Sequence, residues 1–231
     1  MTSDTKAARI TGILFIIATA ASILSLPFLQ PINASNYLVD VSANGNQVTA
    51  GALLSLIAAA ASASIAISMY PILRRYNEVL ALGAVGFRLI EGVFYVVSVV
   101  GLLSLLTLSQ EFVKAGAPDP SYFQTLGALT LAGYHWAGNV TSLLAFSLGA
   151  LMYYVIFYQT RLVPRWLSGW GLVAISLTMA SGVLAMFSLI GPLSTFQVVL
   201  NLPIAVQEMV LAVWLIVNGF NASVMASGSP R

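Results

Sequence analysis

The chain has 231 residues, of which 59% are hydrophobic and only 7% are charged, whereas a soluble globular domain carries roughly 25% charged residues. So few charged side chains cannot cover a water-soluble fold of this length, which excludes an ordinary soluble protein and indicates that most of the outer surface faces lipid. The formal net charge of +2 comes from dispersed basic residues without a cluster or stripe, so nucleic acid is excluded as a partner.

Six apolar runs are long enough to cross the bilayer, whose hydrocarbon core of about 30 Å takes about 20 helical residues. The first run is too long for a secretory signal and shows no clear cleavage site. We therefore predict an all-α fold, a polytopic transmembrane helix bundle that forms a single domain over residues 1–231. In chain order, the predicted spans are residues 8–28, 48–70, 79–108, 124–158, 166–190 and 196–220.

The third and fourth runs are longer than a perpendicular crossing needs, so they must tilt, kink or extend beyond the bilayer. Between them, the segment from Glu111 to Leu126 is interpreted as an interfacial turn or helix at the outer face. Tyr122 and Phe123 would then lie at the level of the lipid headgroups.

The basic residues of the loops predict how the bundle is oriented. Cytoplasmic loops of membrane proteins carry an excess of lysine and arginine, and Lys114 is the one basic loop residue on the opposite side of the six-span path. Both termini are therefore predicted to be cytoplasmic, in a multi-pass protein of the cell membrane. The basic residues on the cytoplasmic side are Lys6, Arg9, Arg74, Arg75, Arg161, Arg165 and Arg231.

Four ionisable residues lie inside the apolar runs: Arg88 and Glu91 in the third, His135 in the fourth and Glu208 in the sixth. A charge at membrane depth costs at least about 2.5 kcal/mol on insertion scales, so such residues usually face the bundle interior and find a partner. At about 1.5 Å per residue, Arg88 and Glu208 lie roughly 17 and 18 Å from the cytoplasmic ends of their helices. They are therefore predicted at one level, with His135 further toward the outer leaflet.

Helical periodicity groups these residues with other polar side chains on three spans. Arg88, Glu91 and Tyr95 share one face of the third span, His135 and Asn139 one face of the fourth, and Asn201 and Glu208 one face of the sixth. Small residues on the first two spans, Ser62 among them, are interpreted as packing positions. We predict a buried polar site between the third, fourth and sixth spans, formed by Arg88, Glu91, Tyr95, His135, Asn139, Asn201 and Glu208.

The three charged residues admit two interpretations. In the first, Arg88 is shared by Glu91 and Glu208 and clamps the third span to the sixth, because a guanidinium fork can hydrogen-bond two carboxylates at once. In the second, the surplus negative charge of two carboxylates over one guanidinium favours a bound cation or a carboxyl group that carries a proton.

Five segments of the chain form a recognisable combination: 8–12 (ARITG), 87–91 (FRLIE), 162–171 (LVPRWLSGWG), 203–209 (PIAVQEM) and 212–220 (AVWLIVNGF). Together they resemble the bacterial and archaeal membrane proteins grouped as the domain of unknown function 4386. The resemblance implies a multi-helix integral membrane protein over nearly the whole chain, with Arg88, Glu91 and Glu208 in its signature segments, and it implies no biochemical activity. Asn218 departs from the family pattern, where a lysine is expected.

Three functions remain open from the sequence. The leading hypothesis is a non-enzymatic protein that binds or translocates a small solute, an ion or a lipid at the polar site. The second is an intramembrane enzyme that uses Glu91, Glu208 and His135 as acid and base or as ligands of one metal. The third is an accessory subunit of a larger membrane complex, or a homo-oligomer, in which the cluster is purely structural. The sequence identifies no cofactor.

Overall fold

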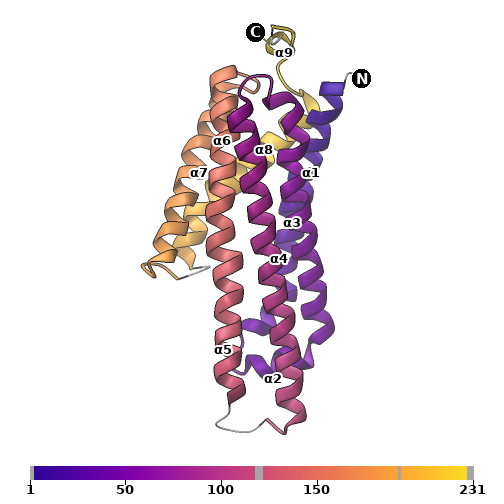
Figure 1. Cartoon of the computed structure of the whole chain (residues 1–231), viewed down its shortest axis with the longest axis vertical. Coiled ribbons are helices and arrows are strands. Elements are labelled where there is room, and N and C mark those ends of the chain that lie inside the picture. The colour runs from indigo at the N-terminus through magenta and orange to yellow at the C-terminus, as the bar shows by residue number, and fades with distance from the viewer. Residues whose placement is uncertain (1–2, 118–121, 192–193, 228–231) are drawn as a thin grey trace.

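The computed structural model describes residues 3–117, 122–191 and 194–227, and its regular elements there are all helices (Figure 1). Six helical segments are long and apolar enough to cross a membrane, which confirms the six predicted spans. Their ends agree with the prediction to within several residues. They are α1 (Ser3–Phe28), α3 (Gly45–Leu73), α4 (Glu78–Lys114), α5 with α6 (Tyr122–His135 and Ser142–Thr160), α7 (Arg165–Met186) and α8 (Thr195–Val217).

Four short elements complete the described chain. A 3₁₀ turn, η1 (Gln30–Asn33), and a helix, α2 (Tyr37–Ala43), join α1 to α3 at one end of the bundle. A helix, α9 (Ala222–Ser227), lies at the opposite end, where α1 begins (Figure 1). One π-helical turn, η2 (Trp136–Thr141), links α5 to α6, so the fourth span is continuous but not regular.

The segment that was expected to form an interfacial turn or helix is mostly part of the spans themselves. Helix α4 continues to Lys114 and α5 starts at Tyr122, while residues 118–121 lie outside the described ranges. The short helix that packs against α4 at this end of the bundle is α2, from the preceding connection.

Local signals in the sequence set several helix ends. The Asn77 side chain accepts a hydrogen bond of 3.0 Å from the Leu80 amide and caps α4, and Ser194 caps α8 in the same way through the Gln197 amide, at 3.4 Å. Such caps satisfy amides that the first helical turn leaves without a partner. Arg161 ends α6 in a left-handed conformation, with φ of 61°, and Pro164 precedes the first turn of α7.

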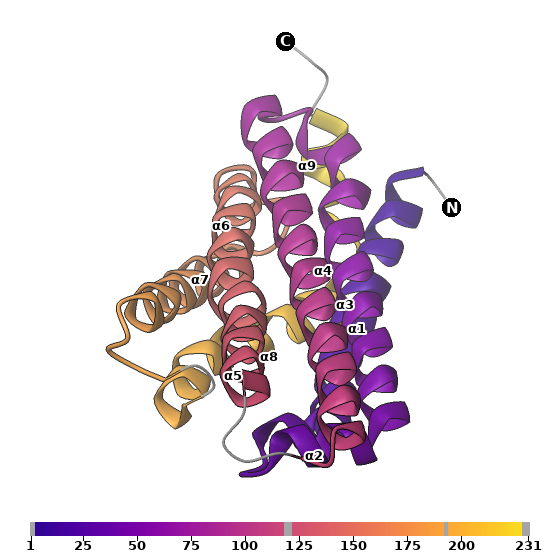
Figure 2. The same ribbon diagram turned by 60° about the horizontal axis from the view of Figure 1, so that its bottom comes forward.

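The six spans pack as a ring. In the order α1, α3, α4, α6, α7 and α8, each packs on the next, and α8 packs back on α1. Helix α8 is inclined to the others and crosses behind them from the side of α7 to the side of α1 (Figures 1 and 2). Because the outward faces carry exposed apolar side chains such as Leu129 (70% exposed) and Val213 (57% exposed), the ring presents an apolar surface to its surroundings.

Candidate functional site

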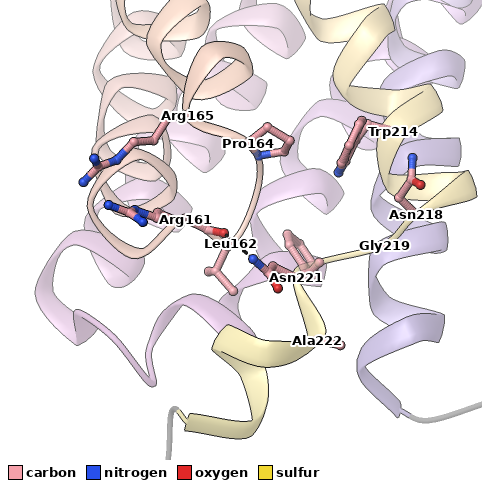
Figure 3. Close-up of a pocket in the computed structure, with 10 residues that line it drawn as sticks. Arg161, Leu162, Pro164, Arg165, Trp214, Asn218, Gly219, Asn221 and Ala222 are labelled. Atoms are coloured by element: carbon pink, nitrogen blue, oxygen red, sulfur yellow. Dashed lines mark hydrogen bonds between the residues drawn. The ribbon is translucent and has the colours of Figure 1, made fainter.

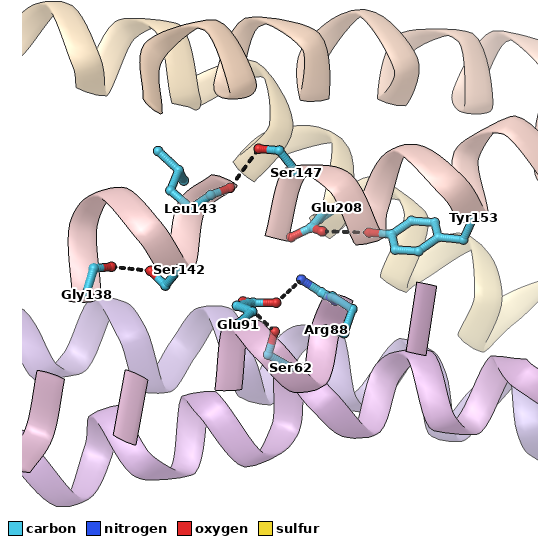
Figure 4. Close-up of polar contacts among 9 residues, drawn as sticks. All are labelled: Ser62, Arg88, Glu91, Gly138, Ser142, Leu143, Ser147, Tyr153 and Glu208. Atoms are coloured by element: carbon cyan, nitrogen blue, oxygen red, sulfur yellow. Dashed lines mark hydrogen bonds and ion pairs between the residues drawn. The ribbon is translucent and has the colours of Figure 1, made fainter. Parts of the chain in front are cut away.

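The centre of the candidate site is an ion pair within α4. Arg88 and Glu91 are three residues apart, and the distance from Arg88 Nη1 to Glu91 Oε2 is 3.0 Å. Their side chains are only 2% and 5% exposed. The second carboxylate oxygen of Glu91 accepts a hydrogen bond of 2.8 Å from Ser62 Oγ on α3 (Figure 4). Both oxygens of Glu91 are thus satisfied within the bundle, as a buried charge requires.

Arg88 also packs tightly against α6. Its guanidinium carbon lies 4.7 Å from the centre of the Phe146 ring and 6.0 Å from that of Tyr153, within the range of cation–π attraction. The absence of a side chain at Gly149 permits this approach, because a Cβ atom there would lie 3.1 Å from Arg88 Cγ and 3.2 Å from the Ala84 carbonyl oxygen. The third and fourth spans are therefore in close contact at the level of Arg88.

Glu208 reaches the same interior from α8 but takes a different partner. Its Oε1 accepts a hydrogen bond of 3.2 Å from the Tyr153 hydroxyl, and the residue is partly buried (Figure 4). Within the described ranges, no basic nitrogen lies within 4.0 Å of the Glu208 carboxylate. Arg88 is therefore not bridged to Glu208, and Glu208 is the carboxylate of the cluster that lacks a close cationic partner.

Helix α8 is held beside Glu208 by the preceding residue. Gln207 is fully buried, and its Nε2 donates a hydrogen bond of 3.0 Å to the Leu167 carbonyl oxygen on α7. Its Oε1 accepts a hydrogen bond from the Tyr154 hydroxyl on α6. Because Gln207 bonds to both α7 and α6, it fixes the rotation of α8 and so the direction in which Glu208 projects.

A cavity of about 350 Å³ lies beside these charged residues. This volume is within the range of small-molecule sites. All six spans contribute to its wall, and the greater part of the wall is apolar. The lining residues are Ala18, Thr19, Ser22 and Ile23 of α1, Ala58, Ser62 and Ile65 of α3, Arg88, Glu91 and Tyr95 of α4, Leu143 and Phe146 of α6, Thr178 of α7, and Asn201, Ile204, Ala205 and Glu208 of α8.

Two residues of this wall carry polar atoms without a hydrogen-bond partner in the described part of the chain: Arg88, through Nε, and Thr178, through Oγ1. Leaving a buried polar atom unpaired costs about 1–3 kcal/mol. Native proteins usually satisfy such groups with water, an ion or a ligand. The two atoms therefore indicate a wall whose polar groups are not all satisfied by the protein itself.

Five of the seven predicted residues come together at the cavity: Arg88, Glu91, Tyr95, Asn201 and Glu208. Asn201 is held through its Oδ1, which accepts a hydrogen bond of 2.8 Å from Ser181 on α7.

His135 and Asn139 do not line this cavity. They pair with each other instead, with 3.0 Å between Asn139 Nδ2 and His135 Nδ1. Asn139 lies inside the π-helical turn η2, whose extra residue per turn changes the face that the polar side chains of the fourth span present. The three predicted polar stripes therefore do not converge on one point.

The acid–base or metal site of the enzyme hypothesis is not assembled. It needs His135 beside Glu91 and Glu208, and His135 lies apart from them along the fourth span. In the described ranges, no three residues among His, Asp and Glu are grouped closely enough to hold a metal ion.

Sequence reasoning missed several residues that hold the charged groups. Ser62 was interpreted as a packing position, and Tyr153, Tyr154 and Gln207 were not singled out. A signal existed for the last three, since two adjacent tyrosines and a glutamine inside apolar runs each need a hydrogen-bond partner. For Ser62 no sequence signal separates a packing serine from one that binds a carboxylate.

A second cavity, larger at about 650 Å³, lies elsewhere, where the chain leaves α6 and α8. Trp214, Pro164 and Asn218 face it, while the guanidinium groups of Arg161 and Arg165 point away (Figure 3). Arg165 stacks on Tyr158 at 5.5 Å. Because its basic groups are directed outward and it contains none of the charged cluster, this cavity is the weaker candidate for a site.

Six membrane-length helices packed as a ring around a partly polar cavity define a multi-pass membrane protein. The chain matches the family described as Domain of unknown function (DUF4386) over residues 10–219, and it belongs to that family. This confirms the resemblance seen in the sequence, and the matched range includes Arg88, Glu91 and Glu208. No curated protein sequence and no solved structure matches the chain at a significant level.

Proposed function

We propose that the protein binds or translocates a small solute, an ion or a lipid at the cavity beside Arg88, Glu91 and Glu208, with Glu208 as the main contact. The observation that carries the proposal is the environment of Glu208. Its carboxylate borders a cavity of about 350 Å³ and accepts a hydrogen bond from a tyrosine hydroxyl, while no basic nitrogen of the described residues lies within 4.0 Å of it.

The alternative of a structural clamp requires Arg88 to be shared between two carboxylates on different helices. Arg88 pairs within its own helix, so the ion pair does not connect α4 to α8. Besides the bond from Tyr153 to Glu208, in which a neutral amide oxygen could accept equally, α8 is joined to α6 and α7 by the neutral side chains of Gln207 and Asn201. A carboxylate at position 208 is therefore not needed to hold the ring together, which supports a role in binding.

The proposal includes the orientation of the ring in a prokaryotic cell membrane. The end of the bundle where α1 begins also holds an ion pair between Arg75 and Asp4, with 3.0 Å between Nη2 and Oδ1, and the two arginines of the α6–α7 connection. Because cytoplasmic loops are enriched in basic residues, we assign this end, with both termini, to the cytoplasm.

The absence of native cysteine permits a direct test, because a single introduced thiol can be labelled without background. In purified full-length protein carrying Asn201→Cys, we expect the cationic reagent aminoethyl methanethiosulfonate to react at least tenfold faster than the anionic sulfonatoethyl reagent, after correction for their intrinsic reactivities. Adding Glu208→Gln should remove most of this preference, since tenfold corresponds to about 1.4 kcal/mol and one nearby carboxylate supplies that much at an effective dielectric constant of about 20.

The matched control is Ser147→Cys, a buried position on α6 that does not line the cavity; it should react slowly with both reagents. If Asn201→Cys is as inert as this control, the cavity is closed to small molecules and the binding proposal fails. If Asn201→Cys reacts but Glu208→Gln leaves the charge preference unchanged, the role assigned to Glu208 is wrong.

A further inference from the structure

The wall of the central cavity is incomplete between the first and last spans. On α3 and α4, the wall residues Ser62, Arg88 and Glu91 are buried. On α1 and α8, by contrast, the wall includes Ser22, Ile23 and Ala205, all of which are exposed, Ile23 to 60%. Residues that line a cavity and are also exposed mark its opening, which therefore lies at the seam between α1 and α8.

The two helices touch closely at one end of this seam and not at the other. A Cβ atom at Gly12 would lie 2.6 Å from the Ala212 carbonyl oxygen and 2.7 Å from Ile216 Cγ1, so the backbones are in contact there. Ser22 lies ten residues further along α1, which is roughly 15 Å. At that level, Ser22 and Ile23 of α1 and Asn201 and Ala205 of α8 all border the cavity. The inclination of α8 across the bundle accounts for this divergence (Figures 1 and 2).

The surroundings of the opening are apolar. Leu24 and Leu26 on α1 are 56% and 51% exposed, and Leu202 and Val206 on α8 are 57% and 45% exposed. All four belong to membrane-length spans, so the opening faces hydrocarbon and not water. A molecule that reaches the cavity by this route must itself dissolve in the bilayer, which favours an amphiphile over a hydrophilic solute or a free ion.

The charges inside the cavity select the headgroup of such an amphiphile. Asn201, Ala205 and Glu208 are spaced i, i+4 and i+7 on α8, so they form one stripe from the seam into the interior. At the inner end of this stripe, Glu208 is the carboxylate that has no basic nitrogen within 4.0 Å in the described part of the chain. An ammonium group is the natural partner of that carboxylate, and an anionic headgroup would meet like charge from Glu208, since the charge of Arg88 is already paired with Glu91.

We propose that the cavity takes an amphiphile with one apolar chain and an ammonium headgroup, which enters from the lipid between α1 and α8. This inference rests on the proposed binding function and adds the ligand class and its route. The ammonium group contacts Glu208, the apolar chain lies along Ile23 and Ala205, and the Arg88–Glu91 pair forms the far wall.

The test compares two probes that differ in their headgroup alone. Lysophosphatidylethanolamine carries an ammonium group, and lysophosphatidylglycerol of the same chain length carries none. Titrated into the full-length protein in detergent and measured by native mass spectrometry, the first should bind at least tenfold more tightly. Glu208→Gln should reduce that preference to within about threefold, because the neutral amide no longer attracts an ammonium group.

The route is tested by closing the opening. Ala205→Trp should slow the association of lysophosphatidylethanolamine at least tenfold when spectra are recorded at increasing times after mixing, whereas Val199→Trp, at a 58% exposed position of α8 outside the cavity, should leave the association rate unchanged. Ser22→Trp narrows the opening from the α1 side and should act as Ala205→Trp does. It serves as the second variant if Ala205→Trp does not fold.

The failures are distinguishable. If the ammonium probe binds and depends on Glu208, but tryptophan at neither position 205 nor position 22 slows its association, the route between α1 and α8 is wrong and the binding site stands. If wild type binds both probes equally while Asn201→Cys still shows its Glu208-dependent charge preference, the ligand class is wrong. If that charge preference is absent as well, the proposed function itself fails.

Discussion

Replacing Arg88 by methionine separates a structural role of the charged cluster from a binding role. Arg88→Met preserves much of the side-chain volume but leaves the Glu91 carboxylate with Ser62 as its remaining partner. At the observed separation of 3.0 Å, two unit charges attract by about 5 kcal/mol at an effective dielectric constant of about 20. This agrees with the roughly 3–5 kcal/mol that is lost when one member of a buried pair is removed.

Glu208→Gln should behave differently, because its carboxylate takes part in no close ion pair in the described structure. The amide oxygen can still accept the hydrogen bond from Tyr153, so the expected loss is no more than about 1 kcal/mol, the difference between a charged and a neutral acceptor. Arg88→Met should therefore lower the free energy of unfolding several times more than Glu208→Gln does.

The assay is unfolding of the full-length protein in mixed micelles with an increasing fraction of sodium dodecyl sulfate, followed by circular dichroism. The double variant Arg88→Met with Glu91→Gln should recover at least half of the loss caused by Arg88→Met, since it removes the unpaired charge and can retain the bond to Ser62. If Glu208→Gln is as destabilising as Arg88→Met, Glu208 belongs to a structural clamp and our account of the cluster is refuted.

Three further predictions concern the rest of the bundle. In intact cells, a membrane-impermeant maleimide should label Ser42→Cys but not Asn221→Cys; labelling of Asn221→Cys alone would reverse the assigned orientation. Gly12→Ala should lower stability by about 1–3 kcal/mol, because its Cβ would lie 2.6 Å from the backbone of α8, whereas Gly86→Ala, with open space around it, should be neutral or stabilising in thermal unfolding. Burial raises the pKa of the Tyr76 hydroxyl, which donates a hydrogen bond to α9. The protonated Tyr76 hydroxyl therefore contributes to stability at neutral pH, and this contribution is lost as the pH rises through the raised pKa. Tyr76→Phe should reduce the loss of stability at alkaline pH in unfolding curves, and an unchanged curve would contradict the role given to Tyr76.

Hydropathy was sufficient to predict the spans, because the bilayer imposes a length and an apolar composition on each helix separately. Counting residues from the helix ends also placed Arg88 and Glu208 at similar depth, and the structure brings both to one cavity. These predictions succeed because they depend on distances along one helix.

Predictions that depend on how helices rotate against each other were less successful. The sequence did not decide how Arg88 is divided between the two carboxylates. In the structure, Arg88 forms its ion pair with Glu91 on the same helix face and not with Glu208 on another span. The π-helical turn in the fourth span changes which side chains share a face, and no periodic pattern in the sequence reveals it. His135 and Asn139 therefore pair with each other instead of lining the cavity. The role of Ser62 could not be predicted for the same reason, since it depends on which part of α4 lies opposite Ser62.

The local character of the Arg88–Glu91 pair has a consequence for how the protein is made. Helices of a membrane protein enter the bilayer in chain order, and an isolated charge in a helix opposes its insertion by at least about 2.5 kcal/mol. Because both members of the pair lie one turn apart on α4, the third span can neutralise its own charges as it is inserted, before the helix that carries Glu208 has been synthesised. Biogenesis of the third span thus does not depend on the last one.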